Sequence, residues 1–467
     1  MKISFYMMGS YAKILRRCVD FLPGVEAVAI SPNWQSYKEA ELEPRLSSVD
    51  YIYSGFNDLF DRIDVSEFCQ RFSSINLSEV LLVDKSHFKK MPGDYQLRYI
   101  CAVGQRLVDI FENTKPDYLF LPIIETIDSM MAYRLAQHFG IRPIVYAHGR
   151  FSNLSFFSES HFELLPPYLE SLPEREGDEQ WAKSFLDDYR SRPGPFQYRP
   201  VFEGGEVYAD VGEKNGMFFR LLRNIWLKNG FEKHNQMIQL WISFQVRFQR
   251  FFVPVRNFLF HLTEKFSIKP KPTPGEGYDF FPLHFSPESS INVPAAFYID
   301  QTRVVDRILL EREGNSPLVV KEHPAMFGFR PKGFYRSLIN RPMVHFVHRK
   351  TPSFELIRKA ATVYSVTGTA CLEAFFLGIK WVQFGNNFLN DWVLRRRTCS
   401  LDSSPQAFIQ DVRKVSRDFV LYSPGVSTNS DQILFAKSNV KKLCEHLLFH
   451  IEQMERMKAH AATGSEG

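Results

Sequence analysis

The stretch from Val363 to Phe384 constrains the fold of this chain more than any other part of the sequence. An apolar, β-branched run ends at Thr367-Gly368-Thr369, a helical segment follows to Leu377, and a second apolar run begins at Trp381. A strand, a tight turn, a helix and a further strand in this order are typical of a parallel α/β sheet. We therefore predict an α/β fold for this part of the chain.

The turn Thr367-Gly368-Thr369 is predicted to bind a phosphate group. Gly368 allows a ligand to approach the backbone closely, and Thr369 stands where a helix N-cap is expected. The N–H groups at the start of a helix attract anions. Glu373, one turn further on, is predicted to bind the hydroxyl groups of a sugar or ribose beside the phosphate. The alternative is a purely structural turn, since every parallel α/β domain contains such connections.

A second buried strand is predicted over residues 317–321, and it is followed by Glu322, His323 and Pro324. Ligands in open α/β sheets bind outside the carboxyl ends of the strands. Lys321 and His323 are therefore predicted to contact the phosphates. The alternative is that His323 closes a loop while Pro324 ends the strand.

Several segments, in their order and spacing, resemble bacterial capsular and surface polysaccharide biosynthesis proteins. They are FPLHFSPESS (281–290), DQ (300–301), VKEHP (320–324) and SVTGTACLEAFFLGIKWVQFG (365–385). That group includes the retaining Kdo transferases, and its HP motif is similar to that of bacterial sialyltransferases. The resemblance covers residues 278–400 and implies a GT-B architecture, in which two Rossmann-like domains with parallel sheets face a cleft. It also implies that His284, Glu288 and Gln301 belong to the pocket for the nucleotide sugar.

The first 150 residues predict a second doubly wound, parallel sheet. Apolar runs alternate with helical segments, of which residues 97–111 and 130–139 are the clearest. The expected strands cover residues 3–7, 25–30, 51–53, 80–83, 118–121 and 144–146. The first turn, MMGSYAK, holds a single glycine, so a dinucleotide cofactor is not expected.

Two strand ends in this half carry candidate catalytic and binding residues. Glu125 and Asp128 follow the strand at 118–121, and either carboxylate is a candidate base or nucleophile for glycosyl transfer. Glu125 is preferred, because the alternative role of Asp128 or Thr126 is to cap the following helix, and for Asp128 this role is equally expected. His148 and Arg150 are predicted to bind the carboxylate of an acidic sugar, or else to form a loop pair without a ligand. No DxD motif stands at a strand end, so we expect no metal requirement.

The length of 467 residues favours two domains with additional segments. We predict an N-terminal Rossmann-like acceptor and catalytic domain over 1–160 and an irregular insert with a basic aromatic segment over 161–271. A C-terminal Rossmann-like domain for the nucleotide sugar is predicted over 272–430, followed by a helix and tail over 431–467. The six cysteines lack the spacing of a disulfide framework or a zinc site, which favours a reducing cytoplasm.

Residues 216–271 form a basic, aromatic segment. They contain ten Lys and Arg against two Glu, a net charge of +8, whereas the whole chain carries only +5. Such a segment suits the headgroups of an anionic membrane, so we expect a peripheral protein of the inner membrane's inner face. The alternative is a pair of core helices. No nucleic-acid recognition motif accompanies the charge, and nucleic acid is not an expected partner.

Together these features predict a glycosyltransferase of capsule or surface polysaccharide assembly. The resemblance implies transfer of an acidic, Kdo-like sugar from a CMP-linked donor to a glycan or lipid-linked glycan, with no cofactor other than the donor. A UDP- or GDP-sugar transferase or a sugar-nucleotide 2-epimerase has the same fold and similar turns, and a non-catalytic glycan-binding assembly factor is a further alternative.

Overall fold

The computed structural model describes residues 1–84, 91–191, 194, 277–286, 289–326, 330–331, 333–347, 350–421 and 433–464. The chain folds as two compact units. Of the described residues, 1–178 and those from 409 onwards form the first unit, and 179–194 and 277–408 form the second. The basic aromatic segment predicted at 216–271 and the predicted ligand Glu288 lie outside the described residues.

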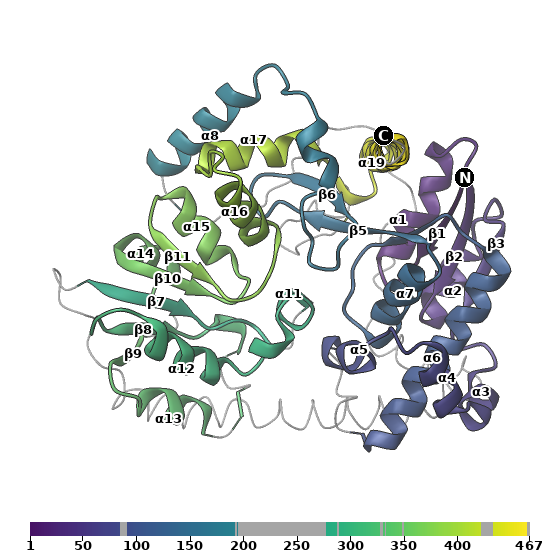
Figure 1. The fold of residues 1–467 in the computed structure, drawn as a ribbon, viewed down its shortest axis with the longest axis horizontal. Helices are drawn as coiled ribbons and strands as arrows, with labels where there is room; N and C mark the ends of the chain where they lie inside the picture. Colours follow the sequence, from purple (N-terminus) through teal and green to yellow (C-terminus); the bar gives the residue numbers. More distant parts are fainter. Residues whose placement is uncertain are drawn as a thin grey trace. The chain divides into compact units, whose positions relative to one another are not determined.

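The first unit contains a seven-stranded sheet with the order β12-β6-β5-β4-β1-β2-β3 (Figure 1). The strands β1 to β5 pair in parallel in the order β3-β2-β1-β4-β5, which is that of a Rossmann-like unit, and β6 and β12 pair antiparallel at one edge. Their bounds are β1 (Lys2–Tyr6), β2 (Glu26–Ser31), β3 (Ser48–Tyr51), β4 (Tyr118–Leu121), β5 (Arg142–His148), β6 (Leu154–Ser158) and β12 (Arg417–Asp418).

The helices of the first unit connect these strands and include one long final helix. They are α1 (Tyr11–Leu15), η1 (Arg16–Phe21), α2 (Trp34–Ala40), α3 (Phe56–Arg62), α4 (Val65–Arg71), α5 (Leu77–Val83), α6 (Gly93–Thr114), α7 (Ile127–His138), η3 (Pro167–Ser171) and α19 (Lys437–Gly464). The strand predicted at 80–83 is wrong: this run belongs to α5, whose N-terminus is capped by the Asn76 side chain accepting from Glu79 N–H.

The second unit contains a five-stranded parallel sheet with the order β11-β10-β7-β8-β9, which repeats the Rossmann-like arrangement. Its strands are β7 (Tyr278–Pro282), β8 (Leu318–Lys321), β9 (Val344–Val347), β10 (Ala360–Ser365) and β11 (Lys380–Gln383). Its helices are α11 (Ser289–Asn292), η4 (Ala296–Tyr298), α12 (Gln301–Glu311), η5 (Pro324–Met326), α13 (Phe334–Ile339), α14 (Ser353–Lys359), α15 (Thr369–Phe376) and α16 (Phe388–Thr398). The helices α8 (Asp178–Ser191) and α17 (Pro405–Val415) each contain a boundary between the two units.

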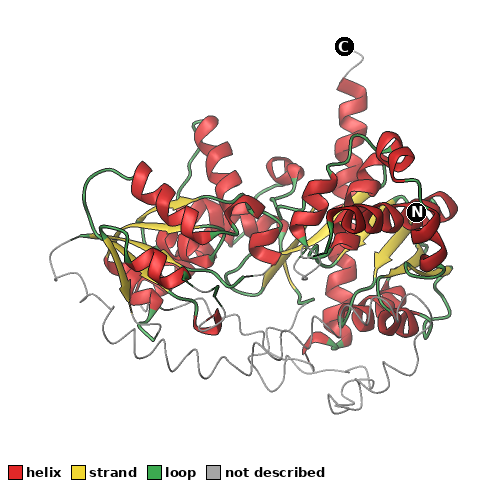
Figure 2. Ribbon diagram, turned by 90° about the horizontal axis from the view of Figure 1, so that it is seen from below, coloured by secondary structure: helices red, strands yellow, loops and turns green. Residues whose placement is uncertain are grey.

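Neighbouring residues of β7 point to opposite faces of the second sheet and bury two separate apolar clusters. Phe281 packs with residues of α12 and α13, whereas Phe280 packs with residues of α14 and α15. Both side chains are fully buried. The sheet is therefore covered by helices on both faces, as Figure 2 shows, an arrangement in which ligands bind at the ends of the strands. The predicted α/β fold with two Rossmann-like units is confirmed.

The final helix α19 packs on the first unit through its apolar stripe. Leu443 and Leu447 are fully buried, and Cys444 Sγ lies 3.7 Å from the Cys18 carbonyl. Further along the helix, His450 Nδ1 lies 2.7 Å from the Tyr168 hydroxyl. Among the residues that the structure describes, no helix combines the length and the apolar character needed to cross a bilayer.

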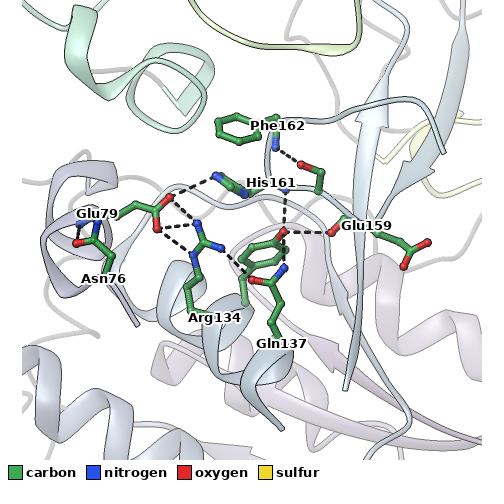
Figure 3. Close-up of polar contacts among 9 residues, drawn as sticks. Asn76, Glu79, Arg134, Gln137, Glu159, His161 and Phe162 are labelled. Carbon is green, nitrogen blue, oxygen red and sulfur yellow. Dashed lines mark hydrogen bonds and ion pairs between the residues drawn. The ribbon is translucent and has the colours of Figure 1, made fainter. Parts of the chain in front are cut away.

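A polar cluster in the first unit ties α5 and α7 to the chain that follows β6 (Figure 3). The Arg134 guanidinium donates to both carboxylate oxygens of Glu79 at 2.6 to 2.9 Å, and His161 Nε2 lies 3.5 Å from Glu79 Oε1. The Tyr133 hydroxyl donates to the Glu159 carbonyl at 3.1 Å and accepts from Gln137. His161 and Arg134 together lower the pKa of Glu79 to about 2.

This cluster predicts an acid-sensitive contribution to the stability of the first unit. Because the folded pKa of Glu79 lies below its ordinary value of 4.5, its stabilisation is present above pH 4.5 and is lost as the pH falls towards 2. Glu79→Gln should therefore lower the free energy of unfolding by about 1 to 3 kcal/mol at pH 7 and by much less at pH 3. Urea unfolding at both pH values measures this, with the exposed Glu67→Gln on α4 as the matched control. Equal losses at pH 7 and pH 3 would contradict it.

Candidate functional site

The candidate site of the second unit lies where the order of its strands reverses. The strands β7 and β10 are neighbours, and the chain continues from them towards opposite edges of the sheet. Ligands of doubly wound sheets bind at this point, outside the carboxyl ends of the strands. His284 follows β7 and the turn Thr367-Gly368 follows β10, so both predicted elements meet at the switch point.

The imidazole of His284 contacts the backbone at the end of β10. Val366 N–H donates to His284 Nε2 at 3.0 Å, and Ser365 Oγ lies 3.2 Å from the same nitrogen. Ser365 Oγ also accepts from Gly368 N–H at 2.9 Å. The fully buried Ser365 therefore joins the histidine to the turn, a role that nothing in the sequence indicated.

Gly368 is required at this turn by close packing. A Cβ atom at this position would lie 2.7 Å from His284 Cε1 and 3.0 Å from Ser365 Oγ, so any side chain would displace the histidine. The predicted N-cap at Thr369 is wrong, because Gly368 is the N-cap and Thr369 is the first residue of α15. The Thr369 hydroxyl instead donates to Glu373 Oε1 at 3.3 Å. Thr367 is fully buried in the same turn.

Glu373 is a buried carboxyl group on the first turns of α15. Its side chain is 7% exposed. Burial raises its pKa to about 7, and the bond from Thr369 offsets this only in part. The group therefore changes its charge near neutral pH, which is unusual for a glutamate and is typical of functional sites.

The predicted cations at the end of β8 have different surroundings. Lys321 is buried, its Nζ donates to Ser353 Oγ at 2.7 Å at the start of α14, and burial lowers its pKa. His323 is exposed, and its ring centroid lies 5.8 Å from that of Phe285. Of the two side chains, His323 is the one that solvent and a ligand can reach.

Glu322 and Arg330 form a buried ion pair that the sequence did not indicate. Their side chains are 1% and 4% exposed, and the guanidinium donates to both carboxylate oxygens at 2.9 Å. Arg330 also donates to the His284 carbonyl at 2.6 Å. Arg330 follows the predicted motif in a stretch without helical or strand periodicity, so only its spatial contacts reveal it.

Gln301 lies beside His284 but is fully buried. Its Oε1 accepts from His284 N–H at 2.7 Å, and its Nε2 donates to the His284 carbonyl at 3.2 Å. The structure thus brings Gln301 and His284 together through the backbone of the histidine.

The candidate catalytic carboxylates lie at the switch point of the first unit, between β1 and β4. Tyr6 closes β1, and its hydroxyl donates to Asp128, whose side chain is buried. Burial raises the pKa of Asp128. The residue that caps α7 is Thr126, whose N–H donates to Ser129 Oγ at 3.0 Å. Of the two caps expected from the sequence, Thr126 is therefore confirmed and Asp128 is wrong. Glu125 precedes this cap and is partly exposed.

His148 is the last residue of β5, and Arg150 lies two residues beyond it. Arg150 N–H donates to His148 Nδ1 at 2.9 Å, and the Arg150 guanidinium pairs with Glu163 at 3.3 Å. Burial and the nearby arginine lower the pKa of His148 to about 4, so its imidazole is neutral at pH 7. Of this pair, only Arg150 carries positive charge at neutral pH. Within the described ranges, no group of three or more His, Cys, Asp or Glu side chains is arranged to hold a metal ion.

Solved structures similar to this chain have low sequence identity to it. The Thermosulfurimonas dismutans KpsC, beta Kdo 2,7 transferase, is 9% identical with a TM-score of 0.42, covering 95% of this chain and 99% of that chain. The beta Kdo 2,4 transferase of the same KpsC is 13% identical with a TM-score of 0.36 and covers 70% and 86%. The UDP-GlcNAc 2-epimerase of Methanocaldococcus jannaschii is 10% identical with a TM-score of 0.26 and covers 96% and 100%.

No curated protein matches the chain. A family model does match the part of the chain that carries the switch point of the second unit. The match extends over residues 281–420 and includes His284, Gly368 and Glu373. In this part the chain matches the family of the capsule polysaccharide biosynthesis protein, which confirms the resemblance seen in its sequence motifs.

Proposed function

We propose that this protein is a glycosyltransferase of capsule or surface polysaccharide assembly. In this proposal it transfers an acidic, Kdo-like sugar from a CMP-linked donor to a glycan or lipid-linked glycan acceptor. The observation that carries the proposal is the arrangement of His284, Gly368 and Glu373 at the switch point of a Rossmann-like unit, inside the segment that matches the capsule family.

The chemistry of these side chains supports a division of roles. The start of α15 offers backbone N–H groups to the departing phosphate, and Lys321 and His323 add positive charge at the neighbouring strand end. Glu373 accepts hydrogen bonds from the ribose hydroxyls. Glu125 acts on the acceptor or the sugar, because a carboxylate at a strand end can remove a proton or trap the anomeric carbon.

The remaining parts of the proposal concern the sugar and the acceptor. Arg150 is the proposed contact of the sugar carboxylate, since a guanidinium binds carboxylates through two parallel bonds. We propose that transfer needs no metal ion. We further propose that residues 216–271, which lie outside the described residues, bring the protein to an anionic membrane where a lipid-linked acceptor is presented.

A panel of nucleotides tests the proposal directly. Thermal unfolding is followed with CMP, UDP, GDP and UMP, because a ligand at 100 times its Kd adds about 2.7 kcal/mol to the stability of the folded state. Stabilisation by CMP above the other nucleotides supports a CMP-linked donor. Stabilisation by UDP instead would favour a UDP-sugar transferase or an epimerase, and no stabilisation by any nucleotide would favour a non-catalytic assembly factor.

His323→Ala is expected to weaken CMP binding without unfolding the protein. His323 is exposed at the end of β8, and a charge-assisted hydrogen bond contributes about 1.5 to 3 kcal/mol, so the Kd should rise about 10- to 100-fold. Titration calorimetry measures the change, and the exposed His460→Ala on α19 is the matched control. An unchanged Kd for CMP in folded His323→Ala would show that the phosphate does not bind at the end of β8.

A further inference from the structure

The backbone of His284 is held by more side-chain contacts than its position after a strand requires. Gln301 binds both its N–H and its carbonyl, at 2.7 and 3.2 Å. Arg330 binds the same carbonyl at 2.6 Å. Gln301 is fully buried, so its amide is committed to this contact. The strand β7 ends at Pro282, and these bonds fix the backbone two residues beyond the end of the strand.

Arg330, which donates to the His284 carbonyl, is itself held by the Glu322 carboxylate. Glu322 accepts two bonds from Arg330, one from the Tyr335 hydroxyl at 2.8 Å and one from His323 N–H at 2.6 Å. Two charges buried to this degree cost several kcal/mol of desolvation, and their pairing is weak evidence for a role in stability alone. A role in fixing geometry is better supported, because the Arg330 Nη2 that donates to Glu322 also donates to the His284 carbonyl.

The imidazole of His284 has one ring nitrogen whose protonation state the structure defines. Nε2 accepts the Val366 N–H at 3.0 Å, and a nitrogen that accepts cannot carry a proton. The neutral ring therefore has its proton on Nδ1. Nδ1 lies on the side of Gly368, 3.2 Å from the place where a Cβ of that residue would lie.

We propose that Gln301 and the Glu322–Arg330 pair are positioning residues that lock His284 as the neutral Nδ1–H tautomer. In this form the ring accepts from Val366 and holds the end of β10 in the shape that takes the nucleotide phosphate. The inference rests on the proposed function for its ligand, whereas the tautomer is a property of the protein alone. Gln301 and Arg330 then act through His284 and do not touch the nucleotide.

A consequence of this arrangement is a dependence of nucleotide binding on pH. Protonation of His284 at Nε2 removes the acceptor of Val366 N–H and leaves a buried donor unpaired. The charged and titratable groups of the elements packed around the ring are Lys321, Glu322, His323, Arg330 and Glu373. Burial raises the pKa of Glu373 to about 7, so the effect of His284 has to be separated from that of Glu373 by substitution.

The tautomer is tested by nuclear magnetic resonance of the full-length protein labelled with 15N-histidine. The couplings from the carbon-bound ring protons to both nitrogens identify the protonated nitrogen, and the signal of His284 is the one lost in His284→Gln. We expect an Nδ1–H tautomer in the wild type and a mixture with the Nε2–H form in Gln301→Met. Arg303→Met, on the same helix α12 and 76% exposed, is the control and should leave the tautomer unchanged. An Nε2–H tautomer in the wild type would overturn the inference.

The effect on binding is measured in the same variants by CMP titration. Gln301→Met removes both hydrogen bonds that hold the His284 backbone and should raise the Kd about tenfold, whereas Arg303→Met should not. His284→Gln offers a neutral acceptor in place of Nε2, so it should bind CMP better than His284→Ala and lose part of the change in Kd between pH 5.5 and 8. If Gln301→Met and Arg303→Met behave alike while the wild type binds CMP, the positioning role is wrong. If the wild type binds no nucleotide, the proposed function fails while the tautomer still tests this inference.

Discussion

Replacement of Glu373 with glutamine is expected to stabilise the folded protein above pH 7 and to weaken nucleotide binding at the same time. The Glu373 carboxyl is 7% exposed, and burial raises its pKa to about 7 from an ordinary value of 4.5. The folded state therefore binds this proton more tightly than the unfolded state. The stability that results is fully present below pH 4.5 and is lost as the pH rises to 7.

The expected size of the stability change in Glu373→Gln follows from the difference between the folded pKa and the ordinary pKa of Glu373. At 1.36 kcal/mol per pKa unit, the charged carboxylate costs the folded protein about 3 kcal/mol at pH 8. Glu373→Gln removes this charge at similar volume, so the free energy of unfolding should rise at pH 8 and change little at pH 4.5. Urea unfolding without ligand measures both values. Glu355→Gln on α14, whose side chain is 51% exposed, is the matched control. A gain of equal size at both pH values would show that the charge of Glu373 is not its cause.

The second half of this prediction concerns binding. An ionised carboxylate can accept hydrogen bonds from both ribose hydroxyls, whereas a glutamine offers one acceptor. The Kd for CMP should therefore rise in Glu373→Gln, and its dependence on pH between 6 and 8 should become smaller. A variant that is more stable and binds less well is the expected sign of a residue retained for function, because such sites store unfavourable interactions. If Glu373→Gln is more stable but binds CMP with unchanged affinity, Glu373 is a core residue without a role in nucleotide binding.

The sequence predicted the elements in which local pattern and tertiary packing agree. The strands β1, β4, β8 and β10 are short apolar runs between turn residues, and each is buried on both faces as such a run predicts. The run at 80–83 satisfies the same pattern but is helical in α5, because the Asn76 cap upstream starts a helix there. The strand β9 did not stand out as an apolar run in the sequence.

The residues of the candidate site likewise include some that the sequence indicates and others that only tertiary contacts reveal. Gly368 and Glu373 could be found in the sequence because a glycine turn at a strand end marks them, whereas His284 was indicated by the resemblance to the capsule family. The helix α12 begins only at Gln301, after a short 3-10 turn at Ala296–Tyr298, and Asp300 caps it by accepting from Thr302 N–H. Ser365 and Arg330 could not be predicted, because their roles depend on contacts with His284, which lies far away in the sequence.

The largest expected effect on catalysis concerns the two carboxylates after β4. Glu125 is partly exposed at the end of this strand, whereas Asp128 is buried beneath the Tyr6 hydroxyl. A general base has to reach the acceptor hydroxyl, and Glu125 is the more accessible of the two. Glu125→Gln keeps the shape and removes the charge, so donor binding should survive while transfer falls by roughly 10²-fold or more.

The matched substitution is Asp128→Asn, which keeps an oxygen that accepts from Tyr6. Because burial raises the pKa of Asp128, loss of its charge should leave the stability at pH 7 unchanged or higher, in contrast to the loss expected of a helix cap. Transfer from a CMP-linked sugar and calorimetric binding of the donor are measured in both variants. The assignment requires that Glu125→Gln binds the donor without transferring its sugar while Asp128→Asn remains active. The reverse result would make the buried Asp128, held by Tyr6 at the switch point, the group that acts on the sugar.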